Sequence, residues 1–341
     1  MVPVVQKQIQ ESLLEKRENL SQWLVTTPVK MRQVYLGAAD EAVVQSQLDN
    51  LDTAVGKAAE GTLGICEVCS DYIDTRLLEM DYTACVCLDH LSLEEKRSLE
   101  MELELAQTVQ RSLLPQQVPD TPLLETAAFS RPAQIVGGDY FDFFRFQDGS
   151  HGIAIGDVAG HGVSASLHMA SVQALLRSMI PTSDAPHEVV GHVNRLLIHN
   201  VRFTNFVALF LGAFDPETYT LTYCNAGHIP PLLLTKGRVM WLGPTGAAIG
   251  LVEDMPYRLE TLELQPGDVL LLCTDGVTEA ENTAGEQFGG ERLAAAAMER
   301  RESSARDLVQ GIRQALETFS AGQPLADDVT IVAYKVAGQG V

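Results

Sequence analysis

Four segments of the chain place an aspartate beside glycine, or beside a second aspartate, at one end of an apolar run. The aspartates are Asp139, Asp157, Asp275 and the pair Asp327 and Asp328. A single Asp-Gly after a strand is most often a turn, because Asp bonds its own backbone and Gly accepts a positive φ. Four repeats of one pattern instead favour a common site to which all four segments contribute. If these strand ends converge, their carboxylates would form an oxygen-lined site for Mg²⁺ or Mn²⁺.

A second set of metal-binding side chains lies upstream. Cys66-x₂-Cys69 is followed, after 17 residues, by Cys87-x₂-His90. Three thiolates and one imidazole in two short-spaced pairs fit a tetrahedral structural Zn²⁺. A redox pair at Cys66 and Cys69 is the alternative, but the second pair at matched spacing favours zinc. Cys85 is predicted to stay a free thiol, since only one residue separates it from Cys87.

The composition limits the class of protein. The chain has 341 residues, 46% of them hydrophobic, which suits about two domains with buried cores. Its 24 basic and 45 acidic residues give a net charge of −21, which disfavours nucleic acid and anionic membranes as partners. No run of about 18 uncharged apolar residues predicts a membrane span, and the N-terminus lacks the apolar stretch of a signal peptide. We therefore expect a cytoplasmic protein, in which the isolated Cys224 and Cys273 are inert core thiols.

The elements that would position these residues change in character along the chain. Two helices are expected first, over residues 5–25 and about 28–59. Strands are expected at residues 124–130, 138–146, 152–157, 206–214, 221–225, 237–242, 269–273 and 329–336. Further helices are expected at residues 164–180, 187–199, 290–300 and 305–319. Strands that neighbour one another in sequence and are covered by helices indicate an α+β architecture.

One long helix is predicted from Leu91 to Leu114, ended by Pro115. Its apolar positions follow a seven-residue repeat flanked by charged residues. These positions are Leu99, Leu103, Ala106 and Leu113. Such a helix packs on its own domain or pairs with a second copy of the chain, and Gln110 at a core position weakens the second alternative only slightly. We expect a homodimer through this coiled-coil linker.

Five motifs, in order, resemble those of the SpoIIE/RsbU group of the 2C-type metal-dependent protein phosphatases. They are Gly-Gly-Asp-Tyr-Phe-Asp from residue 137, Gly-Asp-Val-Ala-Gly-His-Gly from 156, Asn-Ala-Gly-His-Ile-Pro from 225, Thr-Asp-Gly-Val-Thr-Glu from 274 and Asp-Asp-Val-Thr from 327. The resemblance covers roughly residues 105–337. It implies a serine/threonine phosphatase that uses two Mn²⁺ or Mg²⁺ ions on a four-layer α-β-β-α sandwich.

The resemblance also implies roles for individual residues. One metal ion would be held by Asp157, Asp275 and Asp327, and the other by Asp139, Asp157 and the Val158 carbonyl. Two ions bridged by Asp157 would lower the pKa of a shared water and hold it in line with a phosphoserine or phosphothreonine. We expect no protein nucleophile in such a reaction.

Four residues near these motifs have less certain roles. Asp328 is expected to bind a metal or to orient a ligand of the site. His161 is a candidate general acid for the leaving oxygen, with satisfaction of the glycine turn as the alternative. His228 is expected to fix its loop. Arg131 is the arginine nearest to the motifs, and the sequence gives it no role as a phosphate clamp.

The upstream cysteines belong to a second resemblance. Residues 35–95 are similar to the DksA/TraR zinc finger, with His90 where that family usually has a fourth cysteine. The acidic coiled-coil tip of those factors is not recognisable, which disfavours binding to RNA polymerase. The expected domains are a helical segment (1–34), the zinc finger with flanking helices (35–95), a helical linker (96–116) and the phosphatase domain (117–338).

The first resemblance suggests the substrate. Phosphatases of this group act in bacterial partner switching, which implies the phosphoserine of a STAS-type anti-sigma-factor antagonist. Two alternatives stay open. One is a non-catalytic zinc-finger adaptor, against which the intact acidic motifs argue, and the other is a transcription regulator that binds RNA polymerase.

Overall fold

The computed structural model describes residues 41–73, 84–119, 121, 123–160, 162–183, 185–198, 206–323 and 325–337, with scattered positions between 13 and 26. The chain forms two compact units, Met1–Met101 and Glu102–Val341. The described positions between 13 and 26 are helical, in agreement with the first predicted helix. No helix among all the described residues is long and apolar enough to cross a bilayer.

The first unit contains one well-defined helix before the cysteines, α3 (Glu41–Glu60). Gly61, with a φ of 74°, ends this helix in a left-handed turn. The apolar side chains of α3 recur every three or four residues and pack into a small cluster. The cluster comprises Leu13, Leu51, Ala54, Ala58 and Leu63. The apolar stripe of α3 is therefore buried against neighbouring residues of the same unit. This agrees with the expectation that so narrow a stripe needs a partner.

The second long helix, α5, spans Leu93–Leu113 and starts with a capping box. The Glu95 carboxylate accepts from the Ser92 N–H at 2.8 Å, and the Glu95 N–H donates to the Ser92 hydroxyl at 3.2 Å. The predicted repeat positions of this helix are half-buried. A different face, with Met101, Leu105 and Val109 spaced by four residues, leaves 63%, 64% and 51% of these side chains exposed.

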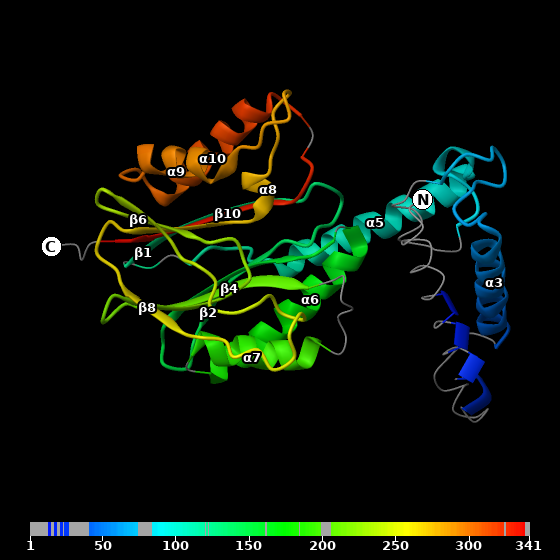
Figure 1. Ribbon diagram of the computed structural model, residues 1–341, viewed down its shortest axis with the longest axis horizontal. Helices are drawn as coiled ribbons and strands as arrows, with labels where there is room; N and C mark the ends of the chain where they lie inside the picture. The colour runs from blue at the N-terminus through cyan, green and yellow to red at the C-terminus, as the bar shows by residue number, and fades with distance from the viewer. Residues whose placement is uncertain are drawn as a thin grey trace. The chain divides into compact units, whose positions relative to one another are not determined.

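The second unit is built on two five-stranded sheets in which every pairing is antiparallel (Figure 1). The first sheet runs in the order β1 (Leu124–Arg131), β10 (Val329–Val336), β9 (Val269–Cys273), β6 (Leu232–Thr235) and β7 (Arg238–Trp241). The second runs in the order β2 (Tyr140–Arg145), β3 (His151–Val158), β4 (Val207–Asp215), β5 (Thr220–Ala226) and β8 (Glu260–Glu263).

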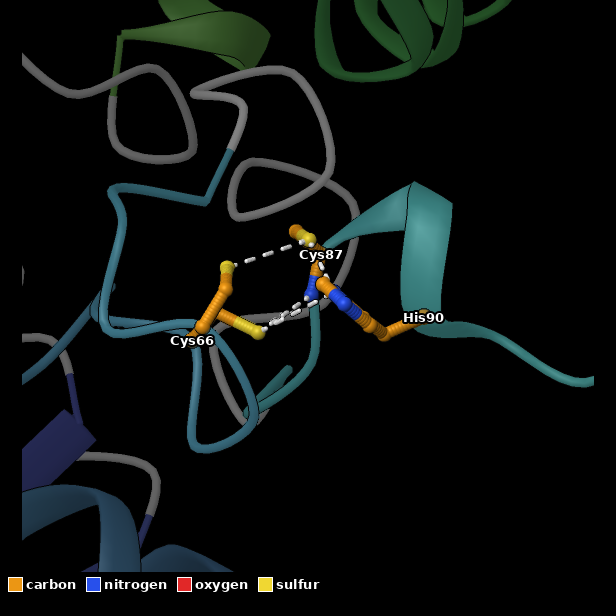
Figure 2. A group of neighbouring side chains, drawn as sticks. Cys66, Cys87 and His90 are labelled. Carbon is orange, nitrogen blue, oxygen red and sulfur yellow. Dashed lines mark hydrogen bonds between the residues drawn. The ribbon is translucent and has the colours of Figure 1, made fainter.

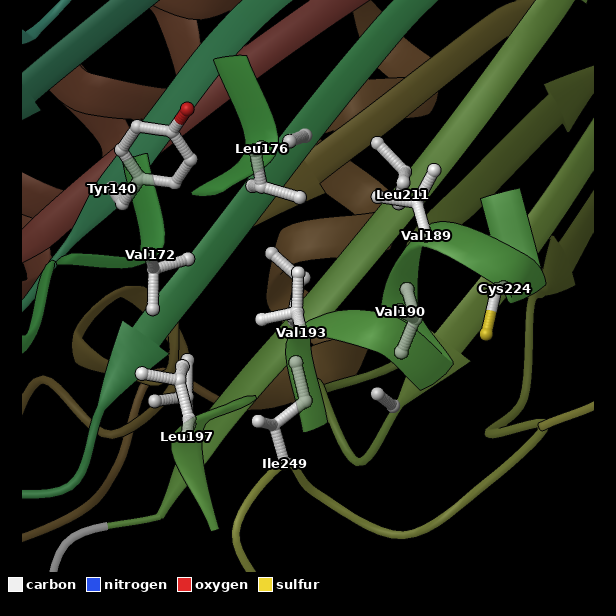
Figure 3. Packing of buried hydrophobic residues seen from close by; sticks show 14 of the residues in the cluster. Tyr140, Val172, Leu176, Val189, Val190, Val193, Leu197, Leu211, Cys224 and Ile249 are labelled. Carbon is white, nitrogen blue, oxygen red and sulfur yellow. The ribbon is translucent and has the colours of Figure 1, made fainter. Parts of the chain in front are cut away.

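Helices cover the outer face of each sheet (Figure 1). The first sheet carries α9 (Gly289–Glu299) and α10 (Ala305–Ser320). The second carries α6 (Gly162–Met179) and α7 (Pro186–Leu197), which pack on it through a mostly aliphatic core (Figure 3). The four layers are therefore helix, sheet, sheet and helix, and the expected α-β-β-α sandwich agrees with this arrangement.

Strand β9 shows why its sequence folds this way. All five residues are apolar, and their side chains alternate between two cores. Val269, Leu271 and Cys273 face the helices, whereas Leu270 and Leu272 pack between the two sheets. A strand buried on both faces needs such an uninterrupted apolar run. This burial also makes Cys273 a core thiol, as predicted from its surroundings.

The predicted strands differ most from the structure around β6 and β7. The single strand expected over residues 237–242 is the shorter β7, and the apolar run before it forms a separate strand, β6. The exposed edge strand β8 and the one-turn helix α8 (Asp275–Thr278) were not predicted. Strand β8 contains two glutamates in four residues, so its sequence lacks the apolar alternation that marks a strand.

Candidate active site

The antiparallel register brings the aspartate motifs to one edge of the sandwich. Tyr140, which follows Asp139, pairs with Gly156, so the start of β2 lies beside Asp157 near the end of β3. In the other sheet, Cys273 at the end of β9 pairs with Ile331 near the start of β10. Asp275 begins α8 directly after β9, and the Asp327–Asp328 pair directly precedes β10.

Hydrogen bonds join the two sheets at this edge. The Thr274 hydroxyl donates to Asp139 Oδ2 at 2.8 Å, and the Gly138 N–H donates to Asp328 Oδ2 at 2.7 Å. The other oxygen of Asp328 accepts from the Ala133 N–H at 2.8 Å. Both carboxylate oxygens of Asp328 therefore bind backbone around β1 and β2. This side chain positions the loop that carries Asp139.

Two glycines are required by the close approach of Asp328. A Cβ atom at Gly137 would lie 2.0 Å from Asp328 Oδ2, and one at Gly276 would lie 2.0 Å from the Asp328 carbonyl oxygen. Real Cβ atoms do not approach oxygen this closely, so neither position accepts a side chain unless Asp328 moves. The glycines of the first and fourth motifs thus serve the packing of the fifth.

A third glycine, Gly138, lies against Asp157 and the Val158 carbonyl. A Cβ atom at Gly138 would lie 2.8 Å from the Val158 carbonyl oxygen and 3.3 Å from Asp157 Oδ1. The carbonyl and the carboxylate therefore lie on the side of β3 that faces the start of β2. These two oxygens belong to the residues that the family resemblance assigns to the metals.

The aspartates of this edge raise one another's pKa. Burial, followed by the charges of Asp275, Asp327 and Asp328, raises the pKa of Asp157 from 3.8 to about 7. Burial and the charge of Asp157 raise the pKa of Asp139 well above its usual value. Burial and then Asp327 raise the pKa of Asp275. No lysine, arginine or histidine forms an ion pair with these five groups in the described part of the chain.

A hard divalent cation fits this donor set. Every side-chain donor is a carboxylate oxygen, the carboxylates repel one another, and no cationic side chain among the described residues pairs with them. Mg²⁺ retains several waters in most protein sites, so such an ion needs only a few carboxylates around it.

The two candidate histidines have different outcomes. His161 lies outside the described residues, so its role as general acid stays a prediction. His228 is 3% exposed. Its backbone N–H donates to Asn225 Oδ1 at 2.9 Å, and its ring Nδ1 lies 2.8 Å from the Ile229 carbonyl oxygen. Burial lowers the pKa of His228 to about 4, against an opposing effect of that carbonyl. A neutral imidazole bound to its own loop agrees with the predicted role in fixing the loop.

The helix α5 reaches the site, which the sequence did not reveal. Gln110 Nε2 donates to the Gly137 carbonyl at 2.6 Å, and the Gly137 N–H donates to Gln110 Oε1 at 3.1 Å. Gln107 Nε2 donates to the Ile135 carbonyl at 3.0 Å. The only signal was a polar side chain at a core position of the apolar repeat. Its partner is a backbone segment two residues before Asp139.

A cavity of about 160 Å³ lies between α5 and the aspartates. Its lining includes Gln110 and Arg111 of α5, Arg131 at the end of β1, and Asp139 and Asp328 of the acidic edge. A substrate could therefore reach the carboxylates along this wall of the phosphatase unit.

The upstream cysteines form a separate four-residue group (Figure 2). Cys69 Sγ and Cys87 Sγ lie 3.8 Å apart, and His90 Nδ1 lies 3.0 Å from Cys87 Sγ and 3.8 Å from Cys66 Sγ. Zn–S bonds of about 2.3 Å give a tetrahedron whose S–S edges are roughly 3.8 Å. The sulfur spacing thus matches a tetrahedral zinc site, and the short 3₁₀ turn η1 (Leu88–His90) brings Cys87 and His90 to one side.

Cys66 is prepared for the thiolate form. Burial raises the pKa of its thiol, but the N–H groups of Cys87, Cys69 and Val68 have the larger combined effect and lower it to about 6. The Cys87 N–H lies 3.3 Å from Cys66 Sγ. Such N–H···S bonds stabilise the charged form that binds metal. Cys85 is not in the group, as the sequence spacing predicted.

Residues 147–337 match the family model described as Stage II sporulation protein E (SpoIIE). The phosphoserine phosphatase RsbU of Bacillus subtilis (strain 168) is 31% identical over 244 residues, which are 70% of this chain and 71% of RsbU. The first 146 residues lie outside the family match, so the resemblance of residues 35–95 to the DksA/TraR zinc finger stays a prediction.

Solved structures share the fold of the second unit. The SiaA-PP2C domain of Pseudomonas aeruginosa has a TM-score of 0.61 and 23% identity, covering 71% of this chain and 98% of that one. The RsbU and RsbW domains of Rv1364c from Mycobacterium tuberculosis have a TM-score of 0.58 and 28% identity, covering 67% of this chain and 64% of that one. With the motifs, the sandwich and the acidic edge in agreement, the chain belongs to the SpoIIE family and is a protein serine/threonine phosphatase.

Proposed function

We propose that this phosphatase removes the phosphoryl group from a phosphoserine or phosphothreonine of a regulatory protein, with two Mn²⁺ or Mg²⁺ ions bound at its acidic edge. One observation carries the proposal: carboxylates from four separate motifs lie close enough to raise one another's pKa, and no cationic side chain among the described residues pairs with them. Such repulsion has no structural benefit unless metal ions bind there.

The residues at the edge would divide the work as follows. Asp157, Asp275 and Asp327 would hold one ion, and Asp139, Asp157 and the Val158 carbonyl would hold the other. The ions, when bound, supply a water of lowered pKa as the nucleophile. Thr274 keeps Asp139 oriented through its 2.8 Å hydrogen bond.

Asp328 has a positioning role in this proposal. Its carboxylate holds the N–H groups of Ala133 and Gly138, so it fixes the segment that precedes Asp139. This assignment departs from a direct metal ligand, which was one of the two predicted roles. His161 keeps its predicted role as general acid.

The proposed substrate class follows from the relatives. RsbU is named a phosphoserine phosphatase. We extend this to a phosphoserine on a STAS-type anti-sigma-factor antagonist, dephosphorylated in the cytoplasm during bacterial partner switching. The net charge of −21 supports a protein substrate over nucleic acid or a membrane surface.

The N-terminal region is proposed to carry input to this site. Residues 35–95 would bind one structural Zn²⁺ through Cys66, Cys69, Cys87 and His90, and residues 96–116 would link them to the phosphatase domain at 117–338. Cys66→Ser should abolish the one zinc ion per chain that elemental analysis detects, whereas Cys85→Ser should retain it.

We also propose a homodimer, formed through a different face of α5 from the one that the repeat predicted. The predicted repeat positions are half-buried within the chain, whereas Leu105 and Val109 on another face of α5 are exposed. Two copies could cover these apolar side chains by pairing their helices. Leu105→Glu should then shift the mass measured by light scattering from dimer to monomer.

Hydrolysis of p-nitrophenyl phosphate and of a phosphoserine peptide tests the enzyme assignment. Activity should require Mn²⁺ or Mg²⁺ and should fall by at least about a hundredfold in Asp157→Asn, which removes one bridging charge at nearly constant size. Metal-independent activity, or full activity in the variant, would contradict the mechanism. A chain with intact metal binding but no hydrolysis would favour the adaptor alternative.

A further inference from the structure

The cavity beside the acidic edge has two walls of opposite charge. One wall is formed by the edge itself, through Asp139 and Asp328. The other is formed by α5 and the end of β1, and it contributes Arg111 and Arg131. Both arginines are exposed. In a protein with a net charge of −21, two guanidinium groups at the entrance to an acidic site call for a physical reason.

Neither guanidinium has a partner among the described residues. Arg111 and Arg131 form no ion pair and no side-chain hydrogen bond with the residues that the structure describes. By contrast, the Arg177 guanidinium binds the buried Asp142 through both oxygens, at 2.7 and 2.9 Å. The side chains of Arg111 and Arg131 are therefore available to an external anion.

The backbone that carries each arginine is fixed against the site. Arg111 follows Gln110, whose amide binds the Gly137 backbone in both directions. Arg131 pairs with Val329 in the β1–β10 register, directly beside Asp328. Both positions are thus set by hydrogen bonds to the segment that carries the catalytic aspartates. A side chain on a fixed backbone binds a ligand with less loss of entropy than one on a mobile loop.

The physical need for these charges comes from the substrate. A phosphoserine segment is anionic, and it must approach a surface crowded with carboxylates. Metal ions, when bound, would attract the phosphoryl group, but acidic residues that flank the phosphoserine would still be repelled by the carboxylates of the enzyme. Cations at the rim of the cavity would lower this local repulsion and raise the encounter rate.

We propose that Arg111 and Arg131 form a cationic rim that binds the acidic residues flanking the phosphoserine of the protein substrate. This inference rests on the proposed function and adds a specificity determinant to it. The rim reads the segment around the phosphoserine, whereas the metal-binding edge acts on the phosphoryl group. Because Arg111 belongs to α5, substrate binding would also contact the helix that leads to the N-terminal unit.

The test compares three substrates with the full-length chain in Mn²⁺. They are a phosphoserine peptide flanked by glutamates, the same peptide flanked by alanines, and p-nitrophenyl phosphate. The double variant Arg111→Ala, Arg131→Ala should lower kcat/KM on the acidic peptide by about tenfold or more, mainly through KM, which corresponds to about 1.4 kcal/mol. The loss should be several times smaller on the other two substrates.

Two further variants separate charge from folding. The double variant with lysines should recover part of the loss, because it keeps both charges without the planar guanidinium geometry. Arg238→Ala removes an exposed arginine of β7 that does not line the cavity, and it should behave as wild type on all three substrates. The effect should also shrink as the salt concentration rises.

The outcomes are distinguishable from a failure of the enzyme assignment. If wild type does not need metal, or if Asp157→Asn remains active, the proposed function itself is wrong. If those controls behave as expected but the double alanine variant keeps its KM on the acidic peptide, only the cationic rim is refuted. An equal loss on all three substrates would likewise refute the rim, since it would indicate damage to the reacting centre.

Discussion

The raised pKa of Asp157 predicts that this aspartate destabilises the metal-free protein at neutral pH. Its carboxyl group has a pKa of about 7 in the folded chain and about 3.8 when unfolded. The folded state therefore binds the proton more tightly, so the free energy of unfolding decreases as pH rises through this interval and is constant above it. Between pH 5.5 and 7 the expected loss is about 2 kcal/mol, at 1.36 kcal/mol for each pH unit.

A matched variant removes the contribution of titrating groups that lie away from the acidic edge. The pKa of His228 is lowered to about 4 by burial, and this shift makes stability rise with pH over an overlapping interval. Wild type and Asp157→Asn share that contribution, so it cancels in their difference. Urea unfolding, followed by far-UV circular dichroism in metal-free buffers from pH 5.5 to 8.5, gives the difference at each pH. The variant should gain about 2 kcal/mol on wild type by pH 7 and little more above pH 8.

Metal ions should reverse the comparison. At 100 times its Kd, Mn²⁺ should stabilise wild type by about 2.7 kcal/mol, because it binds only the folded state. The variant has lost a bridging ligand and should gain much less. Parallel pH curves for the two proteins without metal would refute the reasoning, since they would show that Asp157 is not repelled by its neighbours. The same unfolding series in Mg²⁺ indicates which of the two ions the site prefers.

Three other substitutions probe the groups around the site. Gly137→Ala should reduce activity by at least about tenfold, because the new Cβ atom would lie 2.0 Å from Asp328 Oδ2 and must displace it. The assay is hydrolysis of p-nitrophenyl phosphate, measured as a function of the Mn²⁺ concentration. Gln110→Ala removes both hydrogen bonds to Gly137 and should weaken Mn²⁺ activation several-fold in the same assay, at about 1 kcal/mol for each bond. Arg177→Ala leaves Asp142, which is 1% exposed, without its ion-pair partner and should cost about 2 kcal/mol in urea unfolding. This figure is reduced from that of a fully buried pair because the Arg177 side chain is 51% exposed.

Most elements of the phosphatase unit could be predicted from local sequence. The buried strand β9 is a run of five apolar residues, and the amphipathic helix α10 is capped by Ser304, whose hydroxyl accepts from the Asp307 N–H. Strand β8 escaped prediction because an exposed edge strand needs no apolar alternation. Its strand conformation is imposed by pairing with β5, which is a contact between distant segments.

The candidate site likewise has some features that local sequence predicts and others that depend on contacts between distant segments. The aspartates were found in the sequence because each one interrupts an apolar run with a charge. The comparisons with known proteins confirm the phosphatase assignment that these motifs suggested. The individual metal ligands and the zinc site stay predictions. The contact between Gln110 and Gly137 was not predicted, since nothing in the residues near Gln110 indicates which backbone segment its amide would bind.

The sequence by itself determined which groups can do chemistry, because that depends on residue type and on spacing over a few positions, as in Cys66-x₂-Cys69 and in the paired Asp327 and Asp328. Only the tertiary structure decided what those groups face. Both carboxylate oxygens of Asp328 accept hydrogen bonds from N–H groups that lie 195 and 190 residues away in the chain. The packing of the two sheets brings these groups together. Local residue preferences cannot specify such a contact, because its energy depends on the register of strands that are separated by most of the domain.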